Sequence, residues 1–118
     1  MKVNNAGGQY PTPAEACSEK GWRAVEDLNL TSLFLLSQEV FLRSFQPNRS
    51  GVIVNVIADV WRGFPNMAHT GAARAGVDNL TKTLAIEWAQ HGVRVLSVAP
   101  GTINSTGLNS CKNIQESL

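Results

Sequence analysis

The hydrophobic residues of this chain form two short continuous runs and two long spaced series. Residues 52–57 and 93–98 are mostly β-branched, and runs of that kind predict strands. Apolar residues in 22–43 and in 68–92 recur mostly at three- and four-residue steps, so each segment is expected to form a long helix. A further short strand is expected at Val3 and Asn4, just before a glycine-rich turn.

The order strand, long helix, strand over residues 51–101 indicates a βαβ unit. A crossover of this length joins parallel strands, and strands that are apolar at nearly every position are typical of a sheet covered on both faces. We therefore predict an α/β fold with a parallel sheet. Ligands of such sheets bind beyond the carboxyl ends of the strands, which here are residues 57–59 and 99–102.

Composition narrows the function classes. At 118 residues the chain is one small domain, and a net charge of +1 without a Lys or Arg cluster argues against nucleic-acid or anionic membrane partners. No apolar stretch approaches the length of roughly 20 residues that a membrane span needs. Cys17 and Cys111 lack CxxC spacing and no signal peptide precedes them, so a soluble intracellular protein is expected. His69 and His91 have no acid or second His at ligand spacing, so no metal site is expected.

Several side chains are candidates for a functional role. Asn29 lies near the middle of the first helix, where an Asn is unfavourable unless it is exposed or has a hydrogen-bonding task. Trp61 and Phe64 follow the strand at 52–57, where they either line an apolar pocket or cap the core.

Three charged residues of the second helix share one face. Arg74, Asp78 and Lys82 stand at i, i+4 and i+8, and charges at that spacing form a stabilising ladder. On spacing alone, a structural role for these side chains is favoured over a catalytic one.

Four motifs carry a resemblance to the short-chain dehydrogenase/reductase family. They are Asn4-Asn5-Ala6-Gly7, Leu28-Asn29-Leu30-Thr31, Gly51-Val52-Ile53-Val54-Asn55 and Val98-Ala99-Pro100-Gly101. Their order and spacing match the family up to Ile103. Within the family, residues 63–88 look most like peroxisomal trans-2-enoyl-CoA reductases, and 2,4-dienoyl-CoA reductases are similar there.

This resemblance implies a partial Rossmann-type parallel sheet of about three strands with two long helices. It implies an NADP(H)-dependent oxidoreductase that reduces trans-2-enoyl-CoA, an acyl-CoA substrate, in fatty-acid metabolism. It also implies a homo-oligomer packed through the two long helices. Kinship suggests a peroxisomal location, although Glu116-Ser117-Leu118 differs from the Ser-Lys-Leu address, and the cytoplasm is the alternative.

The resemblance also assigns site residues. Asn29 would hold a water of the proton relay, and cofactor-binding residues would be Asn5, Ala6 and Gly7 at the nucleoside end and Pro100, Gly101, Thr102 and Ile103 at the nicotinamide. The family acid is a Tyr four residues before a Lys. One alignment frame places Thr70 and Arg74 there, and the enoyl-reductase frame places Asp78 and Lys82, so these four are the catalytic candidates.

The chain departs from the family at its phosphate-binding end. It contains no GxGxxG, so residues 1–103 are expected to be an incomplete core without the glycine-rich phosphate turn. Residues 104–118, which are polar, are expected to be a lid remnant or a disordered tail. The alternatives are a catalytically inactive fragment acting as an interaction or oligomerisation module and, among enzymes, a 2,4-dienoyl-CoA or 3-oxoacyl reductase.

Overall fold

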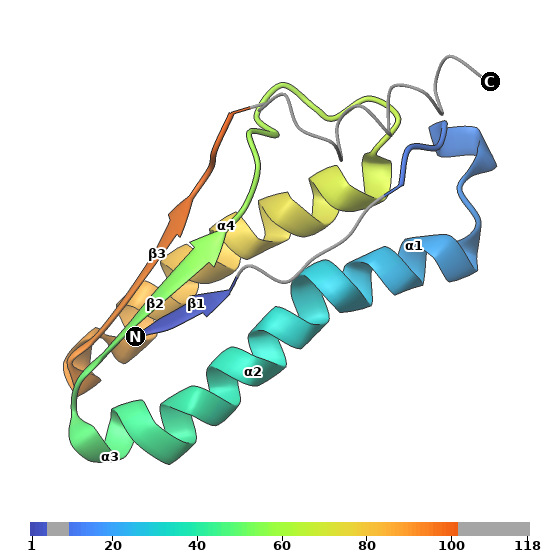
Figure 1. Ribbon diagram of the computed structural model, residues 1–118. Helices are drawn as coiled ribbons and strands as arrows, with labels where there is room; N and C mark the ends of the chain where they lie inside the picture. The colour runs from blue at the N-terminus through green and yellow to red at the C-terminus, as the bar shows by residue number, and fades with distance from the viewer. Residues whose placement is uncertain (5–9, 102–118) are drawn as a thin grey trace.

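A parallel sheet organises the molecule (Figure 1). The computed structural model describes residues 1–4 and 10–101, and within them the strands are β1 (Lys2–Asn4), β2 (Gly51–Val56) and β3 (Val93–Val98). Their order is β1-β2-β3, and all pairs are parallel, with Val3 opposite Val54 and Val54 opposite Leu96. The predicted α/β fold with a partial Rossmann-type sheet and two long helices is therefore confirmed.

The first long helix is continuous but irregular. Its α-helical parts are α1 (Glu19–Glu26), α2 (Ser32–Val40) and α3 (Gln46–Asn48), and π-helical turns at Asp27–Thr31 and Phe41–Phe45 join them. A short 3-10 helix, Ala14–Ala16, precedes them. Ser18 starts the helix, because its side chain accepts a hydrogen bond from the Gly21 main-chain nitrogen at 3.0 Å. The expected helix at 22–43 is thus present, and it continues beyond Arg43 to Asn48.

The second long helix links β2 to β3. It is α4 (Ala68–Trp88), followed by a 3-10 turn, Ala89–His91. Gly92 ends it with a φ of 73°, and a side chain there would collide with the Arg49 carbonyl. The reversal after α4 and the reversal before β2 are therefore packed directly against each other.

Both long helices cover the same face of the sheet. Ile53 and Val95 point to this face, and they form a buried cluster with Phe41 and Phe45 of the first helix and Leu84 of α4. A second cluster, made by Leu33, Ile57 and Val77, lies closer to the carboxyl ends of the strands. Burying these side chains is the main stabilising term of the fold.

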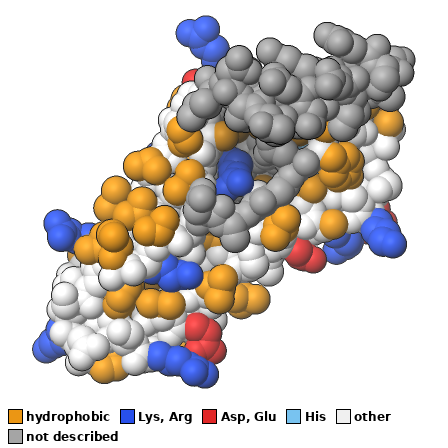
Figure 2. Space-filling view, in the orientation of Figure 1, with side chains coloured by type: hydrophobic (Ala, Val, Ile, Leu, Met, Phe, Trp, Pro, Cys, Tyr) orange, Lys and Arg blue, Asp and Glu red, His pale blue; other side chains and the backbone are white. Residues whose placement is uncertain are grey.

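The opposite face of the sheet differs from the prediction. Apolar side chains on this face remain exposed to solvent. The exposed fraction is 52% for Val3, 42% for Leu96 and 44% for Val98. Figure 2 shows hydrophobic side chains gathered over β2 and β3 on this side. Coverage on both faces was expected, but within residues 1–4 and 10–101 both helices lie on one side. The strand order β1-β2-β3 runs in one direction across the parallel sheet, and crossovers of the usual right hand then place both helices on the same face.

The buried stripe of the first helix also differs from the prediction. Leu28 and Leu36, which belong to the apolar series at 22–43, are 45% and 49% exposed. Every fourth residue is buried instead, namely Val25, Asn29, Leu33, Ser37, Phe41 and Phe45. Two polar side chains therefore lie in the interior of the molecule.

Candidate active site

The carboxyl ends of β2 and β3 form the edge where a ligand of this fold is expected. The strands stay paired to their last residues, and the Ile57 nitrogen donates to the Val98 carbonyl at 2.8 Å. Pro100 and Gly101 follow as exposed backbone, and an added Cβ on Gly101 would meet no described residue within 4 Å. These two predicted cofactor residues are therefore accessible at this edge.

A buried polar network fixes the position of β1 beside this edge. Asn4 Nδ2 donates to Asn55 Oδ1 at 2.7 Å and to Ser37 Oγ at 3.2 Å. Asn55 Nδ2 donates in turn to Thr81 Oγ1 at 2.9 Å, and that hydroxyl donates to the Val77 carbonyl at 2.8 Å. The network connects β1, β2, α2 and α4, so it holds the end of β1 in one place.

Asn29 lies in the first π-helical turn and has no exposed surface. Its Nδ2 donates to the Val25 carbonyl at 2.9 Å. Insertions of π geometry occur often at functional sites, because the extra residue redirects a side chain or a carbonyl. The predicted role of Asn29 in holding a water is untested by these contacts and stays a prediction.

Arg74 brings a cation to the carboxyl end of β2. It is half-buried, and its Nη1 donates to the Val56 carbonyl at 2.9 Å. Burial lowers the pKa of the Arg74 guanidinium, because the charged form loses water. An arginine nevertheless keeps its charge at physiological pH, and no salt bridge to Arg74 occurs among the described residues.

Thr70 and His69 lie one turn before Arg74 and are completely buried. The Thr70 nitrogen donates to His69 Nδ1 at 2.7 Å, so Nδ1 is an acceptor and the neutral ring carries its proton on Nε2. Burial lowers the pKa of His69, and a hydrogen bond with the Tyr10 main chain partly offsets this shift by raising the pKa. A Thr hydroxyl does not ionise near neutral pH, so Thr70 does not replace a catalytic phenol as an acid.

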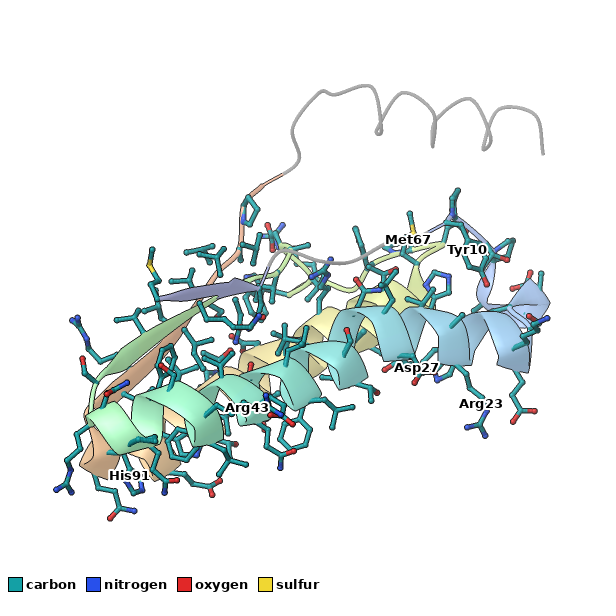
Figure 3. All side chains as sticks on the ribbon, turned by 60° about the horizontal axis from the view of Figure 1, so that its bottom comes forward. Tyr10, Arg23, Asp27, Arg43, Met67 and His91 are labelled. Carbon is teal, nitrogen blue, oxygen red and sulfur yellow. The ribbon has the colours of Figure 1, made fainter. Side chains whose placement is uncertain are left out.

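Tyr10, the single tyrosine of the chain, packs on His69. The two ring centroids are 4.7 Å apart and the planes meet at 64°, an edge-to-face contact. Figure 3 shows Tyr10 near Met67 at the end of the molecule where α1 and α4 begin, and the Thr12 nitrogen donates to the Asn66 carbonyl there at 2.8 Å. The loop before α1 is therefore attached to the loop before α4.

The other candidate pair lies away from this edge. Lys82 Nζ and Asp78 Oδ2 form an ion pair at 3.3 Å, and the Lys82 side chain is 72% exposed. Asp78 follows Thr70 by eight residues, which corresponds to about 12 Å along the helix axis. This geometry is that of the stabilising charge pair that the spacing favoured.

The loop between β2 and α4 presents one aromatic residue to solvent. Trp61 is 60% exposed, so it does not cap the core. Phe64 is half-buried and lies against Gly71 of α4. Val60 and Met67 are buried and anchor the loop on either side.

The remaining predicted cofactor residues, Asn5, Ala6, Gly7, Thr102 and Ile103, lie outside the described residues. In the part of the chain that is described, no group of three or more His, Cys, Asp and Glu side chains could hold a metal. None of the described helices combines the length and apolarity that crossing a membrane requires.

Sequence reasoning missed the network as a unit. Asn4 and Asn55 were noted only inside motifs, and Ser37 and Thr81 were not singled out. A usable signal exists for Asn29 and Ser37, because both interrupt an apolar series at four-residue spacing. The sequence offers no comparable signal for the contact between Tyr10 and His69, since 59 residues separate them.

Comparisons with known proteins agree with one another. A family model described as short chain dehydrogenase matches residues 1–117. A probable 2,4-dienoyl-CoA reductase of Bacillus subtilis is 39% identical over 89% of this chain and 42% of its own length. The peroxisomal 2,4-dienoyl-CoA reductase of Mus musculus is 38% identical over 88% of this chain and 36% of its own length.

Solved structures are similar over the same region. A citronellol catabolism dehydrogenase of Pseudomonas aeruginosa matches with a TM-score of 0.79 and 49% identity, over 84% of this chain and 40% of that one. A gluconate 5-dehydrogenase of Burkholderia cenocepacia in complex with NADP and tartrate matches with a TM-score of 0.82 and 31% identity, over 87% and 40%. The chain spans about two fifths of the length of these relatives.

Proposed function

Because this chain belongs to the short-chain dehydrogenase family, we propose that it is part of an NADP(H)-dependent reductase of trans-2-enoyl-CoA thioesters. Two relatives are named as 2,4-dienoyl-CoA reductases, whose substrates are also unsaturated acyl-CoA thioesters. A reductase of 2,4-dienoyl-CoA is the nearest alternative, and a 3-oxoacyl reductase is a more distant one.

The observation that carries this proposal is the position of Arg74. Its guanidinium donates to the Val56 carbonyl at the carboxyl end of β2, where ligands of parallel sheets bind. A half-buried cation without a described carboxylate partner is suited to stabilise negative charge that develops in a reaction.

Reduction of an enoyl thioester develops such a charge. A hydride adds to C3 of the substrate, the C2–C3 π electrons move toward the thioester carbonyl, and an enolate oxygen becomes negative. Arg74 would stabilise this oxygen by a hydrogen bond from a guanidinium N–H that does not bind Val56. A proton from water then adds to C2, so the product gains one hydride and one proton.

The described residues fit one end of the cofactor. No described residue would obstruct a side chain at Gly101, so exposed backbone at Pro100 and Gly101 can approach a flat nicotinamide carboxamide. When bound, NADPH supplies the hydride and leaves as NADP⁺. No glycine-rich turn precedes α1 or α4, whose preceding residues are Ser18 and Met67, so the pyrophosphate lacks its usual helix N-terminus among the described elements.

The test mixes the purified chain with NADPH and a trans-2-enoyl-CoA and follows the loss of NADPH absorbance. We expect the unsubstituted chain to oxidise NADPH and the Arg74→Met variant to lose this activity. Arg43→Met, which changes an exposed residue of the π-helical turn Phe41–Phe45, is the matched control. Binding of NADPH without turnover would reject the enzymatic proposal and leave the fold assignment intact.

A second candidate function is an inactive interaction module, and one surface favours it. A groove of about 430 Å³ runs between the two long helices, lined by Leu30, Thr31, Phe34, Gly76, Asn79, Leu80 and Thr83. Leu35, Leu42 and Ile86 expose further apolar surface on these helices. We expect a homo-oligomer through these helices, which light scattering coupled to gel filtration would detect and Phe34→Asp would weaken.

The location of the protein is also a proposal. One relative is named as peroxisomal and another comes from a bacterium, so a peroxisome and the cytoplasm are both compatible with kinship. Microscopy of the chain with an N-terminal fluorescent tag, beside a peroxisomal marker, would distinguish the two.

A further inference from the structure

The Tyr10 side chain joins the starts of the two long helices. Its ring packs edge-to-face on His69, the second residue of α4, with the ring centroids 4.7 Å apart. Its hydroxyl lies over Gly21, the third residue of α1, because a Cβ added to Gly21 would collide with that oxygen. One side chain therefore contacts both helices near their first residues.

The main chain around Tyr10 is attached to the loop before α4. The Thr12 nitrogen donates to the Asn66 carbonyl at 2.8 Å, and Pro11 is buried. Residues 10–13, here called the latch, belong to no helix or strand. A segment that lies outside the regular elements and is held by a few contacts can open locally while the helices and the sheet stay folded.

His69 is the residue under the latch whose charge can change near neutral pH. Its side chain is completely buried, and its Nδ1 accepts a hydrogen bond from the Thr70 nitrogen at 2.7 Å. Protonation turns Nδ1 into a donor, so this bond is lost and a charge is left out of water. Thr70 Oγ1, at 3.1 Å, can accept from the new N–H, but a hydroxyl does not neutralise the charge. The protonated ring is therefore more stable in solvent than under Tyr10.

The charges of the neighbouring elements do not compensate for this cost. Of the described charged side chains on α1, on α4 and on the loop between β2 and α4, none contributes to the pKa shift of His69. Burial lowers that pKa, and the hydrogen bond with the Tyr10 main chain partly raises it. Glu26 of α1 and Arg74 of α4 are partly buried, but their own pKa shifts arise from burial and, for Glu26, from Asp27. The titration of His69 is thus controlled by its own burial.

We propose that the latch is sensitive to pH, so that it releases from the start of α4 when His69 is protonated and reattaches when His69 is neutral. The ring gains a proton readily only in the released state, where its pKa returns to the ordinary value of 6.5. The released population therefore rises as pH falls below about 6.5, by up to about tenfold per pH unit. This inference does not depend on the proposed reductase activity.

Hydrogen exchange of the Thr12 main-chain amide measures the release, because release breaks its bond to the Asn66 carbonyl. Its protection factor, measured by NMR and corrected for the intrinsic exchange rate, should fall by up to about tenfold between pH 7.5 and pH 5.5. About 1 M urea should hardly change it, whereas the Ile57 amide, which donates to the Val98 carbonyl in the sheet, should lose protection. Equal urea responses would overturn the proposal, because Thr12 would then exchange only by global unfolding.

Substitutions identify the group that titrates. His69→Gln keeps an acceptor for the Thr70 nitrogen but cannot titrate, so the pH dependence at Thr12 should disappear. His91→Gln, in the 3-10 turn after α4, is the matched control and should retain it. Tyr10→Ala, which removes the ring from His69, should make the Thr12 amide exchange fast at both pH values. PH dependence that persists in His69→Gln, or that is absent from the unsubstituted chain, would reject the proposal.

Discussion

Asn4 of β1 and Asn55 of β2 face each other, and Asn4 Nδ2 donates to Asn55 Oδ1 at 2.7 Å. Both side chains are buried, and Asn55 has no exposed surface. The same Asn4 nitrogen reaches Ser37 Oγ, and Asn55 reaches Thr81 Oγ1. A chain of buried amides and hydroxyls is worth more than separate bonds, because each member that loses its partner is left desolvated. This relationship makes the position of β1 depend on side chains of three other elements.

Asn55→Leu should therefore destabilise the chain by about 2–3 kcal/mol, since it removes the acceptor at 2.7 Å from the Asn4 amide and the donor to the Thr81 hydroxyl oxygen in the interior. The measurement is the free energy of unfolding from urea denaturation. Gln90→Leu, at an exposed position after α4, is the control and should change it by less than about 0.5 kcal/mol. Equal effects of the two substitutions would show that the network contributes little.

Two glycines with positive φ should respond differently to alanine. Gly92 has a φ of 73° and its Cβ would collide with the Arg49 carbonyl, whereas Gly63 has a φ of 84° with nothing within 4 Å. Gly63→Ala should cost about 1–2 kcal/mol for the left-handed backbone alone. Gly92→Ala should cost clearly more, because the backbone must also move. Thermal unfolding of both variants would show the order, and a smaller effect at Gly92 would contradict it.

Stability should fall in mild acid because of His69. Its folded pKa lies below the ordinary value of 6.5, so the unfolded chain binds more protons in this range and stability decreases as pH falls below about 6.5. His69→Phe should remove this dependence while keeping an aromatic contact with Tyr10. His91→Phe is the control and should keep it. Urea midpoints measured between pH 5 and pH 8 provide the comparison.

The titration of Glu26 should make stability decrease as pH rises, which is opposite to the effect of His69. Burial first, and then the neighbouring Asp27 charge, raise the pKa of the Glu26 carboxyl above 4.5, and its Oε1 is buried without a hydrogen-bond partner in the described structure. The folded chain therefore binds more protons, and stability decreases as pH rises from about 4.5 through the folded pKa. Glu26→Gln should be more stable than the parent at neutral pH, with no such gain from Glu15→Gln at an exposed site.

Arg74→Met should reduce the proposed turnover by about a hundredfold, the usual effect of removing one group that stabilises an oxyanion. Arg74→Lys should recover part of that loss, because a point charge remains but the forked donor geometry is absent. The free energy of unfolding should fall by only about 1 kcal/mol, from loss of the bond to the Val56 carbonyl. A loss of activity that merely follows the loss of stability would contradict the role in charge stabilisation.

The parts of the fold that follow from side-chain pattern could be predicted from the sequence. The strands at Ile53 and Val95 and the helix at Val77 appear where β-branched runs and helical spacing placed them. The exposure of Leu28 could not be predicted, because a π turn shifts the helix face without a compositional signature.

The candidate site was predictable only in outline. The edge at Pro100 and Gly101 follows from the rule for parallel sheets, and the motifs placed Arg74 and Asp78 as alternatives. Only three-dimensional geometry distinguishes them, since Arg74 reaches the Val56 carbonyl while Asp78 pairs with Lys82. The contact between Tyr10 and His69 depends on how two loops meet, which local pattern does not encode.

The two π-helical turns explain why a strict four-residue repeat stays on one side of the first helix. In a regular α-helix each step of four residues overshoots a full turn by about 40°, so five steps from Val25 to Phe45 would carry the repeat to the opposite side. A π turn winds less per residue and absorbs the excess. The helix is thus phased by two extra residues. Deleting one residue from Asp27–Thr31 would return that turn to regular α geometry and keep the downstream side chains in phase, whereas deleting one residue from α2 would rotate the downstream part of the helix by about 100°.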